Sequence, residues 1–426
     1  MADRDDLADH PGRPGTSMTR RAFVRAAALG AGGLALAACV PPPASPSLAP
    51  ASQGPAPTAS PTAPAATSSP SPTSAPSAPL LPLRQRIARL LIVGFRGLEV
   101  AAKDPIARAI AEDGLGGVIL FDRDQTTGGA RNVKSKTQLT TLVAALRGLA
   151  LPRELIVAID QEGGFVTRLS PKYGFPPVES EAAIGERGDA AVTAWANGIA
   201  ATLAGVGINL NFAPVVDINV NPTNPAIGAL DRAFSAEGTV VARDAAIEVK
   251  AHREQAVRTA LKHFPGLGSA STNTDFGVAD VTATWRDREL NPYRELLEQD
   301  LVDIVMAAHV VNDQIDPSAP ASLSRATVTD LLRGQLGWNG VVVTDDLGAA
   351  AVTEAFGFED SIGLALNAGN DLLLFANQQA FDPGLAVRVI DTVEGLVEQG
   401  TVAESRIDEA FGRVTRLFGA VFVVPV

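Results

Sequence analysis

The sequence predicts an α/β fold, a (β/α)8 barrel of the TIM type, after an extended N-terminal segment. Beyond residue 82, short apolar runs alternate with amphipathic stretches of helical period. The runs are rich in Val, Ile and Leu and do not alternate strictly with polar residues, which is typical of parallel strands buried on both faces. Ionisable residues directly follow several runs, as expected where barrel strands end on one rim.

Residues 1–39 have the features of an export signal. A twin-arginine pair, Arg20-Arg21, precedes the short apolar stretch Ala26–Ala38, which cannot span a bilayer as a permanent helix. Twin-arginine signals serve the export of folded proteins. The stretch closes with Leu36–Cys39, which resembles a bacterial lipobox, and Cys39 is the only cysteine. We therefore expect an outward-facing membrane lipoprotein anchored at Cys39; an incidental thiol in the leader is the alternative.

Residues 40–82 are dominated by Pro, Ala, Ser and Thr, with almost no charged or aromatic residues. Such a segment cannot bury enough apolar surface to fold, so we expect a disordered tether between the membrane and the domain that follows. The remainder, residues 83–426, has the size of one elaborated barrel, which we expect to be a monomer.

Within the barrel, strands and helices are predicted in alternation. The predicted strands are Leu90–Gly94, Gly117–Phe121, Leu155–Ile159, Ile208–Val216, Val257–Leu261, Ile304–Ala308, Val341–Val343 and Leu372–Phe375. The predicted helices include Lys136–Leu149, Ala190–Ala204, Gly238–Gln255, Leu290–Gln299 and Thr327–Leu336. A doubly wound open sheet is the alternative, but the sequence has no Gly-x-Gly-x-x-Gly after the first strand and no Walker motif.

Ionisable side chains collect at the carboxyl ends of the predicted strands, where a barrel brings them to one rim. These residues are Asp160, Asp217, Lys262, His263, His309, Asp345 and Asp346. A single such residue is more often a cap or a structural rim residue. Five successive strand ends of this kind predict a functional site.

Composition and spacing limit the chemistry of that site. The net charge of −12 and the pI near 4.9 argue against a nucleic-acid partner. The four histidines show no His-x-His or His-Glu-x-x-His spacing, so neither a metal nor another cofactor is expected. No Gly-x-Ser-x-Gly motif is present. Glycoside hydrolysis needs an ionised carboxylate, a proton donor and polar groups for hydroxyls, and Asp345 near Lys262 and Arg232 fits the first need.

A series of motifs extends this prediction. They are Gly116–Phe121, Ile159–Gly164 with Arg168, Asn211–Asp217, Ile227-Gly228, Arg232–Phe234, Lys262–Gly266, Val305–His309, Pro320–Ser324, Gly340–Leu347 and Ala368–Asp371. With these motifs in this order, the chain resembles the bacterial glycoside hydrolase family 3 β-N-acetylglucosaminidases of the single-domain type. The resemblance covers the globular part and implies a retaining hydrolase of β-linked N-acetylglucosamine, with muropeptides as a candidate substrate class.

The resemblance also implies roles for individual residues. Asp345 matches the family nucleophile, which forms a covalent glycosyl-enzyme. Residues that hold the sugar hydroxyls are matched by Asp160, Arg232, Lys262 and His263, and Arg168 is expected to join them. His309 and Asp346 are expected to support the site, and Asp217 to be structural.

The sequence departs from the family after the fifth strand. The family usually has Asp-Ser-His there, with the histidine as general acid/base, whereas this chain has Asn273-Thr274-Asp275. Leu267 and Phe165 also stand where the family often has histidine and arginine. Asp275 is the predicted acid/base, with its pKa raised by enclosure beside Asp345 and its position set by Asn273. The alternatives are an enzyme limited to activated aryl glycosides, a silent saccharide-binding lipoprotein, and a family 3 β-glycosidase of other sugar specificity.

Overall fold

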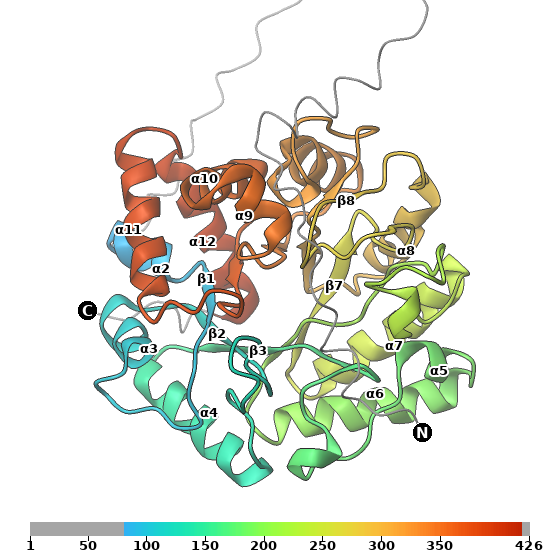
Figure 1. Cartoon of the computed structure of the whole chain (residues 1–426), viewed down its shortest axis with the longest axis horizontal. Helices are drawn as coiled ribbons and strands as arrows, with labels where there is room; N and C mark the ends of the chain where they lie inside the picture. The colour runs from blue at the N-terminus through green and yellow to red at the C-terminus, as the bar shows by residue number, and fades with distance from the viewer. Residues whose placement is uncertain (1–80, 420–426) are drawn as a thin grey trace, which may run out of the picture. The chain divides into compact units, whose positions relative to one another are not determined.

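The computed structural model describes residues 81–419, in which helices surround a barrel of strands (Figure 1). The main sheet has eight strands in the order β11-β9-β7-β6-β3-β2-β1-β12, and every pairing in it is parallel. A bridge between Val343 and Leu372 joins the two end strands and closes the barrel. The strands are β1 (Leu91–Gly94), β2 (Gly117–Leu120), β3 (Ile156–Ile159), β6 (Leu210–Asn211), β7 (Arg258–Phe264), β9 (Ile304–Ala307), β11 (Val341–Thr344) and β12 (Leu373–Phe375). The predicted barrel is therefore confirmed.

All five helices predicted from the sequence are present. They are α4 (Lys136–Ala150), α6 (Asp189–Ala204), α7 (Gly238–Glu254), α8 (Asn291–Glu298) and η8 (Ala326–Gln335), the last with π-helical hydrogen bonding. Further helices are α2 (Leu83–Ala88), α3 (Pro105–Arg108), η3 (Ala109–Asp113), α5 (Glu181–Gly185), α9 (Ala350–Phe356), α10 (Phe358–Ala368), α11 (Leu385–Glu398) and α12 (Glu404–Phe418). Local capping explains why α4 begins where it does, because the Ser135 hydroxyl accepts the Gln138 N–H at 3.2 Å.

Two strands differ from their predicted bounds by more than one residue at an end. The fourth was predicted over Ile208–Val216, but β6 contains only Leu210–Asn211, and pairing with β7 resumes at an isolated bridge between Val215 and Lys262. Pro214, which has no N–H to donate to a ladder, lies between the two paired segments. The fifth was predicted to end at Leu261, yet β7 continues to Phe264. Lys262 and His263 are therefore residues of β7 itself and do not follow the strand.

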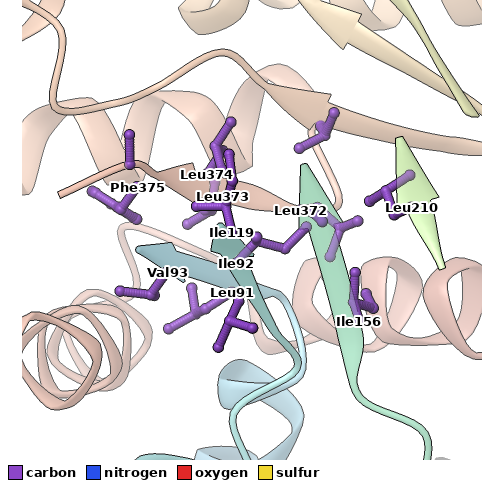
Figure 2. Close-up of a cluster of buried hydrophobic side chains, with 14 of the residues drawn as sticks. Leu91, Ile92, Val93, Ile119, Ile156, Leu210, Leu372, Leu373, Leu374 and Phe375 are labelled. Atoms are coloured by element: carbon purple, nitrogen blue, oxygen red, sulfur yellow. The ribbon is translucent and has the colours of Figure 1, made fainter. Parts of the chain in front are cut away.

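The barrel encloses an apolar core. Figure 2 shows part of it, where side chains of β1, β2, β3, β6 and β12 lie together. The labelled residues are each at most 4% exposed, and they are Leu91, Ile92, Val93, Ile119, Ile156, Leu210, Leu372, Leu373, Leu374 and Phe375. Burial of this kind stabilises the fold by about 25 cal/mol per Å² of apolar surface. This packed core supports the strand ends that form the rim.

Short elements follow the barrel strands at their carboxyl ends. The hairpin β4 (Gln161–Gly163) and β5 (Val166–Thr167) follows β3, and β8 (Ala279–Asp280) pairs with β10 (Val310–Val311). No helix within residues 81–419 is long and apolar enough to cross a bilayer. The predicted export signal with Cys39, and nearly all of the predicted tether, lie outside the described residues.

Candidate active site

A cavity of about 200 Å³ lies at the carboxyl ends of the barrel strands. Almost all the residues predicted for the site line it, namely Asp160, Arg168, Arg232, Lys262, His263, Asn273, Asp275, Asp345 and Asp346. His309 does not line the cavity but lies buried beside it. The tertiary structure thus brings together side chains that are up to 186 positions apart, from Asp160 to Asp346.

A buried ion cluster forms one wall of the cavity. Lys262 Nζ lies 2.8 Å from Asp160 Oδ1 and 2.6 Å from Glu162 Oε1. Arg232 binds Glu162 with two nitrogens, Nε and Nη2, at 2.7 and 2.8 Å. Burial alone would raise the pKa of Glu162, but the charges of Arg232 and Lys262 outweigh it and hold that pKa far below its usual range. The cluster fixes the orientation of both cations.

Glu162 is a site residue that the sequence reasoning missed. It lines the cavity from β4, two residues after Asp160, and its side chain is 1% exposed. The signal was present, because Asp160-Gln161-Glu162 is one of the motifs and a carboxylate in an otherwise buried segment needs a cationic partner. Which cations serve as partners depends on β7 and on the loop that carries Arg232, far along the chain.

Removing the charge of Glu162 tests the cluster. We expect Glu162→Gln to lower the free energy of unfolding by about 3 kcal/mol, because Lys262 and Arg232 would keep buried charges with fewer partners. Urea denaturation measures this change. The exposed pair Arg325–Asp330, at 3.8 Å with side chains 70% and 57% exposed, supplies the control: Asp330→Asn should change stability by less than about 0.5 kcal/mol. Equal effects of the two substitutions would contradict the buried-cluster account.

Asp345 follows β11 directly and presents an ionised carboxylate to the cavity. Its backbone N–H donates to the Ala307 carbonyl of β9 at 2.9 Å, which continues the ladder up to the rim. Its Oδ1 accepts the Asp346 N–H at 2.9 Å. Burial would raise the pKa of Asp345, but His309, His263, this N–H and Lys262 outweigh burial and keep the pKa below its usual range.

His309 holds the backbone next to Asp345, at Asp346. Its Nε2 lies 2.8 Å from the Asp346 carbonyl oxygen, which can only accept, so Nε2 carries the proton. Its Nδ1 lies 2.6 Å from the Ser322 hydroxyl oxygen. Burial lowers the pKa of His309, while the charge of Asp345 raises it. Besides its electrostatic effect on the pKa of Asp345, His309 thus holds the backbone that follows Asp345.

Asp346 ties two strand ends together. Its Oδ1 accepts the N–H of Gly348 at 2.9 Å and the N–H of Ala376, just past β12, at 2.8 Å. Burial raises the pKa of Asp346 to about 7 despite these two bonds, with the charge of Asp345 contributing further. Asp346 therefore holds the backbone of two strand ends, and its supporting role in catalysis stays a prediction.

His263 is oriented by Asp217. Asp217 Oδ2 lies 2.6 Å from His263 Nδ1, so the imidazole donates from Nδ1 and directs Nε2 to the side of Arg232, whose Nη2 is 3.4 Å away. The other Asp217 oxygen accepts the Leu267 N–H at 2.7 Å. Asp217 thereby fixes the turn from which the next loop departs, in agreement with its predicted structural role.

That loop brings Asp275 to the mouth of the cavity. The Asp275 N–H donates to Asn273 Oδ1 at 3.0 Å, so Asn273 orients its backbone. Asp275 is exposed as a residue, and its carboxyl group lines the cavity. Desolvation of this carboxyl group and, second, the charge of Asp345 raise the pKa of Asp275 above its usual range. One carboxyl group with a lowered pKa and one with a raised pKa thus share the cavity, which is the usual arrangement for a base or nucleophile and an acid.

Comparison with known proteins places these features in a family. The family model described as the glycosyl hydrolase family 3 N-terminal domain matches residues 82–417. A β-hexosaminidase of Xanthomonas axonopodis pv. citri (strain 306) is 34% identical over 326 residues, which cover 72% of this chain and 87% of that protein. β-Hexosaminidase A of Pseudoalteromonas piscicida is 34% identical over 292 residues, 63% of this chain, but the match spans only 47% of its own length.

Solved structures agree. That of a glycoside hydrolase family 3 β-N-acetylglucosaminidase from Paenibacillus sp. str. FPU-7 is 36% identical, with a TM-score of 0.72, over 82% of this chain and 64% of that one. The family and fold predicted from the motif series are confirmed by these matches. The chain belongs to glycosyl hydrolase family 3.

Proposed function

We propose that the chain is a retaining glycosidase that removes β-linked N-acetylglucosamine, with Asp345 as nucleophile and Asp275 as general acid/base. The observation that carries this proposal is the pair of carboxyl groups in one cavity whose pKa values are shifted in opposite directions. The names of the β-hexosaminidase relatives support a β-linked hexosamine, and the similar Paenibacillus structure is that of a β-N-acetylglucosaminidase.

The ion cluster supplies the sugar-binding groups. Asp160 and Glu162 accept hydrogen bonds, whereas Lys262, Arg232 and Arg168 donate them, and all five line the cavity. Because Lys262 and Arg232 are already held by Glu162, they need not be ordered again when the substrate binds. A pyranose with several hydroxyl groups suits such a mixed set of donors and acceptors.

Two displacements at the anomeric carbon complete the reaction. A carboxylate oxygen of Asp345 attacks C1 as the bond from C1 to the glycosidic oxygen breaks, and the Asp275 proton passes to that oxygen. Water then attacks C1 from the face that the leaving group vacated, while the Asp275 carboxylate takes its proton. The C1–Asp345 bond breaks, and the sugar leaves with its β configuration retained.

Steady-state kinetics on paired aryl glycosides tests the proposal. We expect turnover of an aryl β-N-acetylglucosaminide and, at equal concentration, far less turnover of the matching aryl β-glucoside. The reverse preference would favour a family 3 β-glycosidase of other specificity.

The substitution of the usual loop histidine by Asp275 favours a second candidate, a saccharide-binding protein without catalysis. Binding of N-acetylglucosamine with no turnover of either glycoside would support that candidate.

We also propose attachment to the cell envelope through Cys39, with peptidoglycan fragments as substrates. The lipobox-like Leu36–Cys39 and the twin-arginine pair support export and acylation. In the native bacterium, Cys39→Ala is expected to move the protein from the membrane fraction to the soluble fraction and to abolish its labelling by a fatty acid, because no acyl chain can be attached. Replacing Arg20-Arg21 by two lysines should instead block export. Unchanged membrane association of Cys39→Ala would contradict lipid anchoring.

A further inference from the structure

The segment that carries the proposed proton donor has few contacts that hold it in place. Residues 271–277 lie between β7 and β8 and include Asp275. The internal hydrogen bonds of this segment run from the Asp275 N–H to Asn273 Oδ1 at 3.0 Å and from the Phe276 N–H to the Asn273 carbonyl at 3.1 Å. Within the described part of the chain, one hydrogen bond joins the segment to the rest of the protein. In it, Gln379 Nε2 donates to the Asp275 carbonyl at 3.0 Å, across 104 positions of sequence.

Gln379 stands on a loop that is itself firmly anchored to the rim. The loop follows β12, and its Ala376 N–H donates to Asp346 Oδ1 at 2.8 Å. Gln378 is 4% exposed and accepts from Arg131 Nη1 at 3.1 Å. Its Nε2 donates to a backbone carbonyl of the loop after β2, also at 3.1 Å. Because these buried polar groups are paired, the backbone of Gln379 starts from a fixed position.

This loop connects the proposed nucleophile to the proposed acid. The Asp346 N–H donates to Asp345 Oδ1 at 2.9 Å, and the Asp346 carboxylate accepts the Ala376 N–H. Three residues beyond Ala376, Gln379 holds Asp275. A path of hydrogen bonds and main chain thus runs around the cavity from one carboxyl group to the other. Retaining glycosidases need these two groups about 5–5.5 Å apart, so a restraint on this path bears on proton transfer.

An aspartate in the role of acid increases the importance of this restraint. The carboxyl group of aspartate lies closer to its own main chain than the distal nitrogen of a histidine does. A general acid must come within hydrogen-bond distance of the glycosidic oxygen, so the main chain of Asp275 must approach that oxygen more closely. Gln379 binds the main chain of Asp275, at its carbonyl, and its own side chain lines the same cavity.

We propose that Gln379 is a positioning residue for the general acid/base. It holds the main chain of Asp275 at the distance from Asp345 at which the Asp275 proton reaches the leaving oxygen. Since this restraint exists before the substrate binds, less of the segment has to be ordered during catalysis. The inference rests on the proposed glycosidase function and adds one requirement to it: loss of the Gln379 bond should slow only those substrates whose leaving group needs a proton.

Replacement of Gln379 by side chains of similar length tests this role. Gln379→Met keeps the length but has no N–H to donate. On N,N′-diacetylchitobiose, whose leaving oxygen needs a proton, we expect kcat/KM to fall about tenfold, mainly through kcat, as for the loss of one hydrogen bond. On a 2,4-dinitrophenyl glycoside, which leaves without a proton, the fall should be less than about twofold. Gln379→Lys can donate to the carbonyl again and should recover most of the loss on chitobiose.

Gln299→Met is the matched control. Gln299 is exposed and does not line the cavity, and its Nε2 donates to the Glu295 carbonyl at 3.1 Å, so the substitution removes the same kind of bond elsewhere. It should change neither rate. Similar losses on the two substrates in Gln379→Met would mean that Gln379 binds the sugar, and an unchanged chitobiose rate would mean that its bond is dispensable. Either result overturns the proposal.

The pH profile supplies a readout that a general loss of stability would not change. Desolvation raises the pKa of Asp275, so a segment that is released toward water should have a lower Asp275 pKa than the wild type. Because Asp275 must be protonated, kcat/KM on chitobiose should begin to fall at a lower pH in Gln379→Met. The acidic limb, which depends on Asp345, should not move. A basic limb at the wild-type pH would contradict the restraint.

Hydrogen–deuterium exchange makes the test independent of turnover. Peptides that cover residues 271–277 should exchange faster in Gln379→Met than in the wild type, whereas Gln299→Met should leave their exchange unchanged. If the wild-type protein hydrolyses neither glycoside, the proposed function fails, and exchange alone decides the restraint. Faster exchange of this segment in Gln379→Met supports the restraint, and unchanged exchange overturns it.

Discussion

Asp345→Gly is expected to lose at least about a thousandfold in kcat on an aryl β-N-acetylglucosaminide, because it removes the atom that bonds to C1. The fold should survive, since the Asp345 backbone bond to Ala307 does not involve the side chain. Added azide ion can enter the vacated space and attack C1 from the same side. The expected product is the α-linked glycosyl azide, which NMR identifies by its anomeric coupling.

The adjacent carboxyl group provides the control for this experiment. Asp346→Asn keeps an oxygen that can accept the N–H groups of Gly348 and Ala376, so its loss of activity should stay within about tenfold. A β-linked azide product, or equal losses in the two variants, would contradict the assignment of Asp345 as nucleophile.

Asp275→Ala is expected to separate substrates by leaving group. With chitobiose, whose leaving oxygen must be protonated, kcat/KM should fall about 10²- to 10⁴-fold. With a 2,4-dinitrophenyl glycoside, which leaves without a proton, the fall should be less than about tenfold. Asp280→Asn serves as control, because Asp280 is an exposed carboxylate close in sequence whose Oδ1 caps the Thr282 N–H, as an asparagine oxygen also can. Equal losses on both substrates would exclude Asp275 as the acid.

The pH dependence of kcat/KM also tests the roles of Asp345 and Asp275. Asp345 must be ionised, so kcat/KM should rise as the pH increases through its lowered pKa. Asp275 must be protonated, so kcat/KM should fall as the pH increases through its raised pKa. Asp275→Ala should therefore lose the basic limb and keep the acidic limb. A basic limb that persists in the variant would assign it to another group.

The sequence predicted the barrel because buried parallel strands have a distinctive composition that needs no tertiary information. It also located most of the rim residues, because they follow or end a strand, whereas Asp217 lies six positions beyond the end of β6. It failed on the exact end of β7 and on the shortened β6, since strand ends depend on which neighbouring backbone groups are free to pair. Pro214 was visible in the sequence, and its missing N–H could have indicated that the predicted strand Ile208–Val216 is interrupted.

The roles of Glu162 and Gln379 could be recognised only in the three-dimensional structure. The role of Glu162 depends on its ion pairs with Arg232 and Lys262, which lie on other strands and loops. Gln379 contacts Asp275 only through the closure of the barrel, which brings the loop after β12 near the loop after β7. Neither residue stands in a local pattern that predicts its partner.

The sequence by itself thus determined the fold, the family and the set of ionisable groups on the rim, because strand composition and motif order are local properties of the chain. Only the tertiary structure decided which of these groups are paired and which face the cavity. Protonation depends on burial and on charges a few ångströms away, and those distances exist only once the barrel has closed.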